Sequence, residues 1–215
     1  MRSEEEQAEL LREWWEKNGR TLIIAILVSV VGLLGWRQWS ATQDARAESA
    51  STVYSALSQA LERAGAGEDP EAMAAVREQA DRLLEEYPRT TYAAQARLAL
   101  ARLAVMEEDY EEAAAQLRAV VDRSPTSAIE HMARLRLARV LLQQGDAEGA
   151  LTLVRRDYPE AWRGQALEIR GDALRAQDRH EDARAAYTAA LEAMSSGEPT
   201  RDRVQMKLDD MTPAS

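Results

Sequence analysis

The chain has 215 residues, no cysteine and a formal net charge of −10 at pH 7. The absence of cysteine excludes disulfide frameworks, thiolate zinc sites, iron–sulfur clusters and cysteine nucleophiles. The acidic charge argues against a general nucleic-acid binder, which needs a basic face. Ala, Leu, Glu and Arg are abundant, whereas there are only 10 Gly and 6 Pro, a composition that favours helices over a β-sandwich or barrel.

The first predicted element is a transmembrane helix over residues 21–39. No charged residue falls between Arg20 and Arg37. This stretch is shorter than the roughly 20 apolar residues of a comfortable span, but both arginines can extend their charged groups toward the lipid headgroups. Trp15 and Trp36 would lie about 32 Å apart along a helix, close to the thickness of the hydrocarbon layer. The expected membrane interface is Trp14, Trp15, Arg20, Trp36, Arg37 and Trp39.

Two other interpretations of this segment are a buried core helix and a cleaved signal peptide. A core helix would not need Trp and Arg at both ends. The small-x-small pattern at Ala45 and Ala47 resembles a cleavage site, but it lies far from the apolar stretch, and residues 1–20 are net acidic, unlike the basic start of a signal peptide. We therefore favour an uncleaved, single-pass anchor.

The distribution of Lys and Arg predicts the orientation of this anchor. Residues 1–20 contain more basic residues than residues 37–56, which favours a cytoplasmic N-terminal tail over residues 1–20. The large C-terminal part would then lie in the periplasm of a Gram-negative bacterium, with the anchor in the inner membrane.

Three small residues form a stripe on the predicted span. Ala25, Ser29 and Gly32 follow one another at helical spacing, which would allow another helix to approach closely. The stripe is therefore a possible helix-docking face. Small residues are also common in membrane spans, and both interpretations remain open.

Helical repeats are predicted after the span. No Gly or Pro occurs between Ala41 and Ala64, so residues 40–64 are expected to form a helical stem that continues the anchor. A repeat domain over residues 65–215 follows, with helices expected near 70–86, 91–107, 110–122, 127–143, 147–157, 162–176, 180–194 and 200–211.

When the sequence of this region is aligned with itself after shifts of 37 and then 33 residues, small residues coincide at two positions of the repeat, called here the two columns. Such spacing, with a proline after the second helix of each unit, is typical of tetratricopeptide repeats. The predicted fold is all-α: a single transmembrane helix followed by a tetratricopeptide-like α-solenoid with a concave face. Repeat packing is assigned to Ala101, Ala138 and Gly171 in the first column and Ala113, Ala150 and Ala183 in the second.

The sequence contains no pattern that indicates catalysis. His131 and His180 lack a partner at metal-ligand spacing and are interpreted as solvated surface residues. Neither a phosphate-binding glycine loop nor a nucleophile elbow is present. We therefore expect no enzyme activity, cofactor or metal. The last predicted helix places Val204, Leu208 and Met211 on one face and is interpreted as a cap on the final repeat.

Five stretches of the sequence make the chain resemble the YfgM family, the ancillary subunits of the bacterial Sec translocon. They are Asn18-Gly19, residues 35–39, residues 135–140, the stretch from Trp162 to Leu174, and residues 205–210. The Gly35-Trp36-Arg37 exit from the span and the Gln-Met-Lys-Leu-Asp-Asp end are the most specific of these.

The resemblance implies contacts with the SecYEG translocon and with PpiD, a membrane-anchored periplasmic chaperone. It also implies a role in passing newly translocated proteins, the possible clients, to the periplasmic chaperone network. The alternative is a generic membrane-anchored repeat adaptor of the cell-envelope or division machinery.

Overall fold

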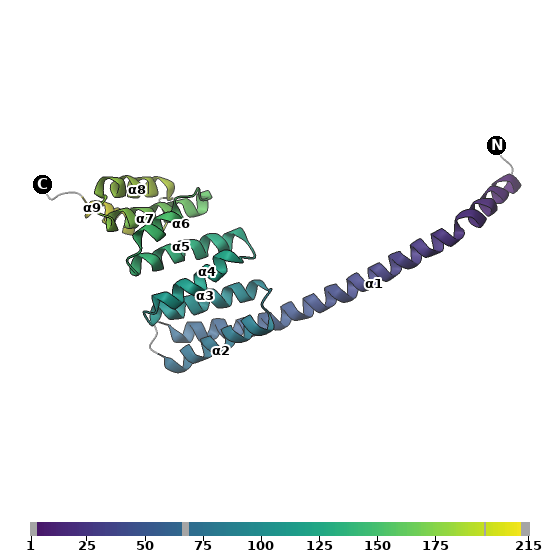
Figure 1. Ribbon diagram of the computed structural model, residues 1–215, viewed down its shortest axis with the longest axis horizontal. Helices are drawn as coiled ribbons and strands as arrows, with labels where there is room; N and C mark the ends of the chain where they lie inside the picture. The colour runs from purple at the N-terminus through teal and green to yellow at the C-terminus, as the bar shows by residue number, and fades with distance from the viewer. Residues whose placement is uncertain (1–3, 66–68, 196, 212–215) are drawn as a thin grey trace. The chain divides into compact units, whose positions relative to one another are not determined.

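A computed structural model of the chain describes residues 4–65, 69–195 and 197–211. Within the first helix, the side chains of residues 4–11, 13, 16, 21–22, 25–26, 39 and 41–44 lie outside this description. All regular elements of the described residues are α-helices (Figure 1), which confirms the all-α class. They are α1 (Glu4–Ala64), α2 (Pro70–Glu86), α3 (Thr91–Met106), α4 (Tyr110–Asp122), α5 (Ser127–Gln143), α6 (Ala147–Val154), α7 (Glu160–Ala176), α8 (His180–Ala193) and α9 (Arg201–Asp209).

The helices α2, α4 and α5 have the predicted bounds, and most of the others differ by one or two residues. Two of the larger differences concern α7 and α6. Pro159 forms the N-cap of α7, so this helix starts at Glu160 rather than at residue 162. The residue after Val154, Arg155, ends α6 three residues earlier than expected.

The chain divides into two compact units, Met1–Ser49 and Ala50–Ser215. In the first unit, the described large apolar side chains of α1, such as Ile24 and Val31, are exposed. Among the residues that the structure describes, no helix is both long and apolar enough to cross a membrane.

The second unit begins inside the segment described above as a stem. Val53, Leu57 and Ala64 of α1 are buried in one apolar cluster with Val76 and Leu83 of α2 and with part of α3. The last turns of α1 therefore form the first helix of a hairpin with α2. Similar hairpins follow, α3 with α4, α5 with α6 and α7 with α8, and α9 packs on the last one (Figure 1).

The turns inside three successive hairpins share one backbone conformation. Glu108, Gly145 and Asp178 each have a positive φ, of 60°, 82° and 59°. In each turn, the amide of the next residue donates a hydrogen bond of 2.8–3.0 Å to a carbonyl in the preceding helix. This left-handed ending satisfies the last carbonyls of the helix and reverses the chain in a fixed direction. The repeat is therefore present in the backbone as well as in the side chains.

The residues of the two small columns are buried between helices. Ala101, Ala113, Ala138, Ala150 and Ala183 are at most 3% exposed. At Gly171, an added Cβ would lie 2.6 Å from Cδ1 of Tyr187. The Tyr187 ring of α8 therefore packs directly on the backbone of α7.

We expect Gly171→Ala to destabilise the repeat unit by about 1–3 kcal/mol, because overpacking forces the backbones of α7 and α8 apart. The measurement is thermal unfolding of the full chain. Gly197→Ala is the matched control, since a Cβ at Gly197 would meet no atom within 4 Å. Equal melting temperatures for Gly171→Ala and the wild type would contradict the close contact with Tyr187.

Candidate protein-binding groove

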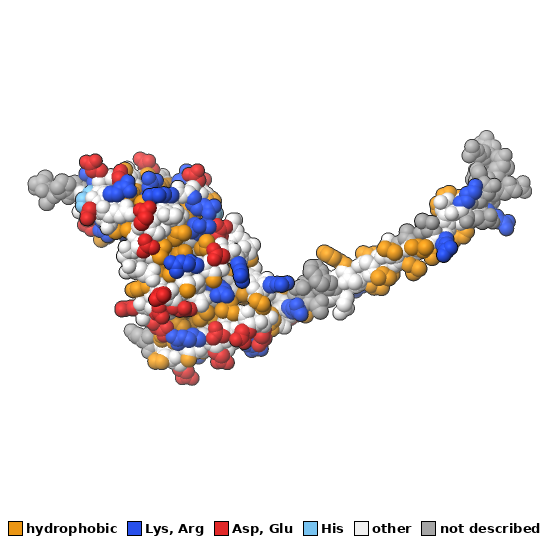
Figure 2. Space-filling view, in the orientation of Figure 1, with side chains coloured by type: hydrophobic (Ala, Val, Ile, Leu, Met, Phe, Trp, Pro, Cys, Tyr) orange, Lys and Arg blue, Asp and Glu red, His pale blue; other side chains and the backbone are white. Residues whose placement is uncertain are grey.

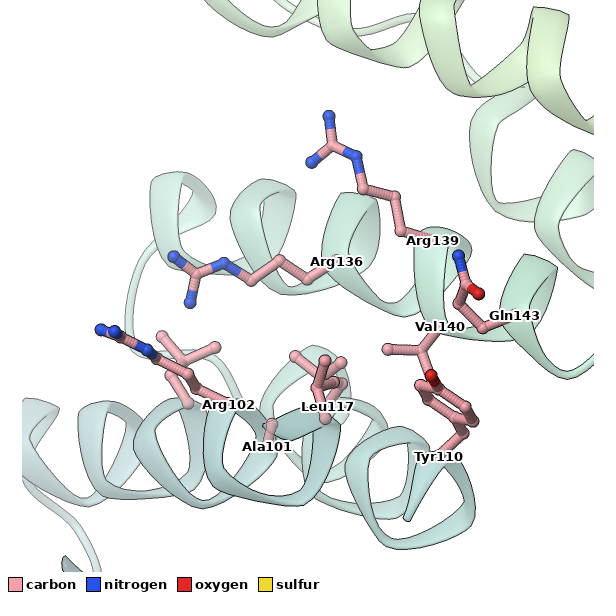
Figure 3. Close-up of a pocket in the computed structure, with 10 residues that line it drawn as sticks. Ala101, Arg102, Tyr110, Leu117, Arg136, Arg139, Val140 and Gln143 are labelled. Atoms are coloured by element: carbon pink, nitrogen blue, oxygen red, sulfur yellow. The ribbon is translucent and has the colours of Figure 1, made fainter. Parts of the chain in front are cut away.

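A hollow of about 500 Å³ lies between α3 and α5 (Figure 3). Its apolar lining comes from Leu98, Ala101, Leu117 and Val140, and the ring of Tyr110 closes one end. The side chain of Val105, also in the lining, is 40% exposed. Leu98, Ala101, Leu117 and Val140 are themselves at most 5% exposed, so the hollow presents a small apolar surface, mainly beside Val105, to a partner.

Three arginines, Arg102, Arg136 and Arg139, also line this hollow. In Figure 3 the guanidinium groups of Arg102 and Arg136 extend in the same direction at one end of the hollow, and Arg139 extends away from them. Arg139 lies 3.6 Å from a carboxylate oxygen of Glu168. Arg102 donates a weak hydrogen bond of 3.4 Å to the carbonyl oxygen of Gly65.

Arg136 has no ion pair or hydrogen bond within the part of the chain that the structure describes. Packing against the groove removes part of the hydration of its guanidinium group, and this lowers the pKa of Arg136; the positive charges of Arg139 and Arg102 lower it further. The local environment therefore disfavours a positive charge that no neighbouring carboxylate compensates. A bound anion would relieve this imbalance.

A second, smaller hollow of about 180 Å³ adjoins the first. Tyr54, Leu57 and Leu61 of α1 line it on one side, while Arg102 and Arg136 line both hollows. Leu98 is also common to the two. Together they form one groove, called here the inner groove, which runs from residues 54–61 of α1 across α3 to α5.

An ion-pair cluster around Glu168 holds the C-terminal helix in place. Glu168 of α7 is 1% exposed. Both of its oxygens accept hydrogen bonds of 2.8 Å from Arg203, and Lys207 donates another of 2.8 Å. Lys207 also binds Asp172 at 2.7 Å, and Asp172 accepts a hydrogen bond from the Tyr187 hydroxyl.

The charge state of Glu168 follows from these contacts. Burial opposes ionisation of the carboxyl group, but the hydrogen bonds and charges of Arg203 and Lys207 outweigh it, so the pKa of Glu168 is lowered. Beside the cluster, Val204 is fully buried, and Leu208 and Met211 pack partly against the core. The expected cap is therefore held by ion pairs to the buried Glu168 as well as by apolar contacts.

The residues predicted as a membrane interface are exposed where the structure describes them: Trp14, Trp15, Arg20, Trp36 and Arg37. The side chain of Trp39 lies outside the described residues. In the small stripe, Ser29 and Gly32 are exposed, and the side chain of Ala25 is outside the description. The alanines of the two repeat columns therefore lie in one core of the repeat unit. The predicted membrane interface and the small stripe both lie on α1.

The interpretation of His131 as a solvated surface residue was wrong. Its ring lies 5.4 Å from that of Tyr158 and 6.3 Å from that of Trp162, and its Nδ1 atom is buried. His131 is therefore a packing residue between α5 and α7. Among the described residues, no group of His, Cys, Asp and Glu could hold a metal ion.

Sequence reasoning did not identify Glu168 or the groove arginines as functional candidates. A signal was present for two of the arginines, because Arg102 and Arg139 are related by the 37-residue shift that relates Ala101 and Ala138. The partners of Glu168 lie 35 and 39 residues further along the chain, and no local spacing indicates such a contact.

The sequence profile of the tetratricopeptide repeat-like domain family matches residues 12–213. Relatives named "Ancillary SecYEG translocon subunit" are similar over nearly their whole length. The chain is 28% identical to the protein from Haemophilus influenzae over 209 residues, 97% of each chain. It is 29% identical to the Escherichia coli protein over 211 residues, 98% of this chain and 97% of the relative. The Neisseria gonorrhoeae protein is 28% identical over 214 residues, 96% of this chain and 97% of the relative.

We expect Glu168→Gln to destabilise the repeat unit by about 2–3 kcal/mol near neutral pH, because Arg203 and Lys207 lose their shared counter-charge. Glu192→Gln, at an exposed position of α8, should leave stability unchanged. The measurement is urea unfolding of the full-length proteins.

The pH dependence provides a second readout of the same substitution. Because the pKa of Glu168 is lowered in the folded state, the ionised carboxylate stabilises the fold above its unfolded-state pKa of about 4.3. This stabilisation is lost as the pH falls through the lower folded-state value. The difference in the free energy of unfolding between wild type and Glu168→Gln should therefore become smaller below about pH 4. A gap that does not change with pH would exclude the ion pair as its cause.

Proposed function

We propose that this chain, which belongs to the tetratricopeptide repeat-like domain family, is a non-catalytic ancillary subunit of the bacterial SecYEG translocon. The observation that carries the proposal is the similarity over nearly the whole chain to proteins named for that role. Such full-length similarity includes both α1 and the repeat unit, so it extends beyond a shared repeat pattern. A solenoid works by presenting surfaces to other proteins, and the inner groove is such a surface.

We propose that residues 21–39 of α1 anchor the chain in the bacterial inner membrane as a single pass. Residues 1–20 would form a cytoplasmic tail, and the C-terminal domain would lie in the periplasm. The proposal is supported by the exposed apolar side chains between Arg20 and Arg37. Exposed tryptophans at both ends of this stretch support it too, because Trp is enriched at membrane–water interfaces.

On the periplasmic side, the repeat unit would contact a membrane-anchored chaperone similar to PpiD. In this arrangement the protein brings the chaperone close to the translocon exit, where newly translocated clients emerge. The resemblance to the YfgM family supports this role. The protein would then act as a scaffold through protein–protein contacts alone, with no cofactor.

We expect SecYEG to co-purify with the full chain after mild detergent extraction of membranes. The small stripe should contribute, because close packing of helices is a main source of association in lipid. Ser29→Leu with Gly32→Leu should therefore reduce SecYEG recovery without affecting membrane insertion. The measurement is quantitative pull-down at matched expression.

Val28→Leu with Val31→Leu is the matched control, because it adds bulk at neighbouring positions of α1 outside the stripe. It should leave SecYEG recovery unchanged. Equal recovery with both double variants would remove the stripe from the interface. Recovery of other envelope proteins in place of SecYEG would favour the generic adaptor.

We expect protease added to spheroplasts to digest the chain after Trp39 and to spare its N-terminal residues. This follows from the excess of Lys and Arg before the span. The measurement is immunoblotting with epitope tags at either end. A protected C-terminal tag in intact spheroplasts would reverse the proposed orientation.

A further inference from the structure

We infer that the inner groove binds an extended polypeptide segment in which one acidic residue is flanked on both sides by apolar residues. The acidic side chain would pair with Arg102 and Arg136, and its neighbours would enter the two hollows on either side. This inference rests on the proposed function, because it assumes that the solenoid acts by binding other polypeptides.

The order of the groove lining predicts the order of the ligand. One hollow is lined by Tyr54, Leu57 and Leu61, and the other by Ala101, Leu117 and Val140. Arg102 and Arg136 are the two charged residues that belong to both. A ligand that fills both hollows must therefore pass the two guanidinium groups between its apolar side chains.

The charges of the groove select a carboxylate at this central point. Two guanidinium groups extend in the same direction at one end of the first hollow (Figure 3), and the described residues provide no ion-pair partner for Arg136. The third arginine, Arg139, already lies near Glu168. A guanidinium group presents a planar set of donors that matches a carboxylate. Arg102 and Arg136 are therefore the pair available for an incoming acidic side chain.

The surroundings favour a short polypeptide over a polyanion. The chain as a whole carries a formal charge of −10, and the face of the repeat unit shown in Figure 2 carries many acidic side chains. Such a surface repels nucleic acid and anionic membranes at long range, whereas a single carboxylate among apolar residues interacts mainly with the local arginine pair. A free phosphate has no apolar groups that could fill the two hollows.

The experiment measures binding of a peptide pool to the purified full chain in an uncharged detergent. The fluorescein-labelled peptides carry Glu at the centre, mixed Leu, Ile, Val and Phe at the positions two residues away on each side, and Ser or Gly elsewhere. Fluorescence anisotropy should show saturable binding that weakens as salt is added. A pool with Gln at the centre should bind at least about tenfold more weakly.

Substitutions in the protein locate the binding to the groove. Arg136→Gln and Arg102→Gln should each weaken binding of the Glu pool by at least about tenfold. Arg118→Gln is the matched control, because Arg118 is an exposed arginine of α4 outside both hollows. It should bind like the wild type, and circular dichroism would verify that all three variants are folded.

Several results would overturn the inference. The Glu pool could fail to bind, it could bind no better than the Gln pool, or Arg136→Gln could bind it like the wild type. Binding of vesicles that contain anionic lipid, lost in Arg136→Gln, together with no peptide binding, would assign the groove to lipid. SecYEG pull-down with Arg136→Gln separates the two proposals. If Arg136→Gln loses peptide binding but still recovers SecYEG normally, both proposals are supported. If the wild-type chain itself does not recover SecYEG, that result contradicts the proposed function and leaves the peptide-binding measurement as the test of the groove.

Discussion

The close approach of paired helices is the constraint on which the repeat unit depends. Each helix hairpin is too thin to bury its apolar face alone, so it must pack on the next one. Close packing requires a small residue wherever two backbones meet, and the buried alanines and Gly171 occupy those positions. Tyr187 shows how tight the fit is, since its ring fills the space that a side chain at Gly171 would need.

The turns fix how the two helices of each hairpin meet. A left-handed residue at Glu108, Gly145 and Asp178 sets the same reversal three times. Only one of these residues is a glycine, so two turns adopt a conformation that ordinary side chains disfavour. Packing of the flanking helices evidently compensates for this local cost. The first helices of two successive hairpins, α3 and α5, both contribute arginines to the inner groove.

Much of the repeat unit could be predicted from the sequence, because its signals are local and periodic. Proline and glycine mark the helix ends, and small residues recur at nearly constant spacing. The start of the compact unit at Ala50 could not be predicted in this way. The helix α1 continues through it without a Gly or Pro, and only contacts with α2 and α3 distinguish residues 50–64 from those before them.

The sites were harder to predict than the helices for a related reason. Glu168 reads as one more surface glutamate of an amphipathic helix, and its burial depends on Arg203 and Lys207 far along the chain. The inner groove combines residues of α1, α3 and α5. The chain is rich in arginine, so the sequence does not distinguish the groove arginines. Their apolar neighbours, and the lack of a carboxylate partner for Arg136 among the described residues, appear only in the structure.

The ion pairs of Glu168 also bear on how the chain is completed during synthesis. Arg203 and Lys207 lie 35 and 39 residues after Glu168, so the ribosome adds them after α7 is complete. Until they arrive, the carboxylate of Glu168 lacks its two hydrogen-bonded counter-ions, and only Arg139, 3.6 Å away in the folded chain, offsets the cost of its burial. Before α9 is in place, the last hairpin should therefore be looser and more open to proteases.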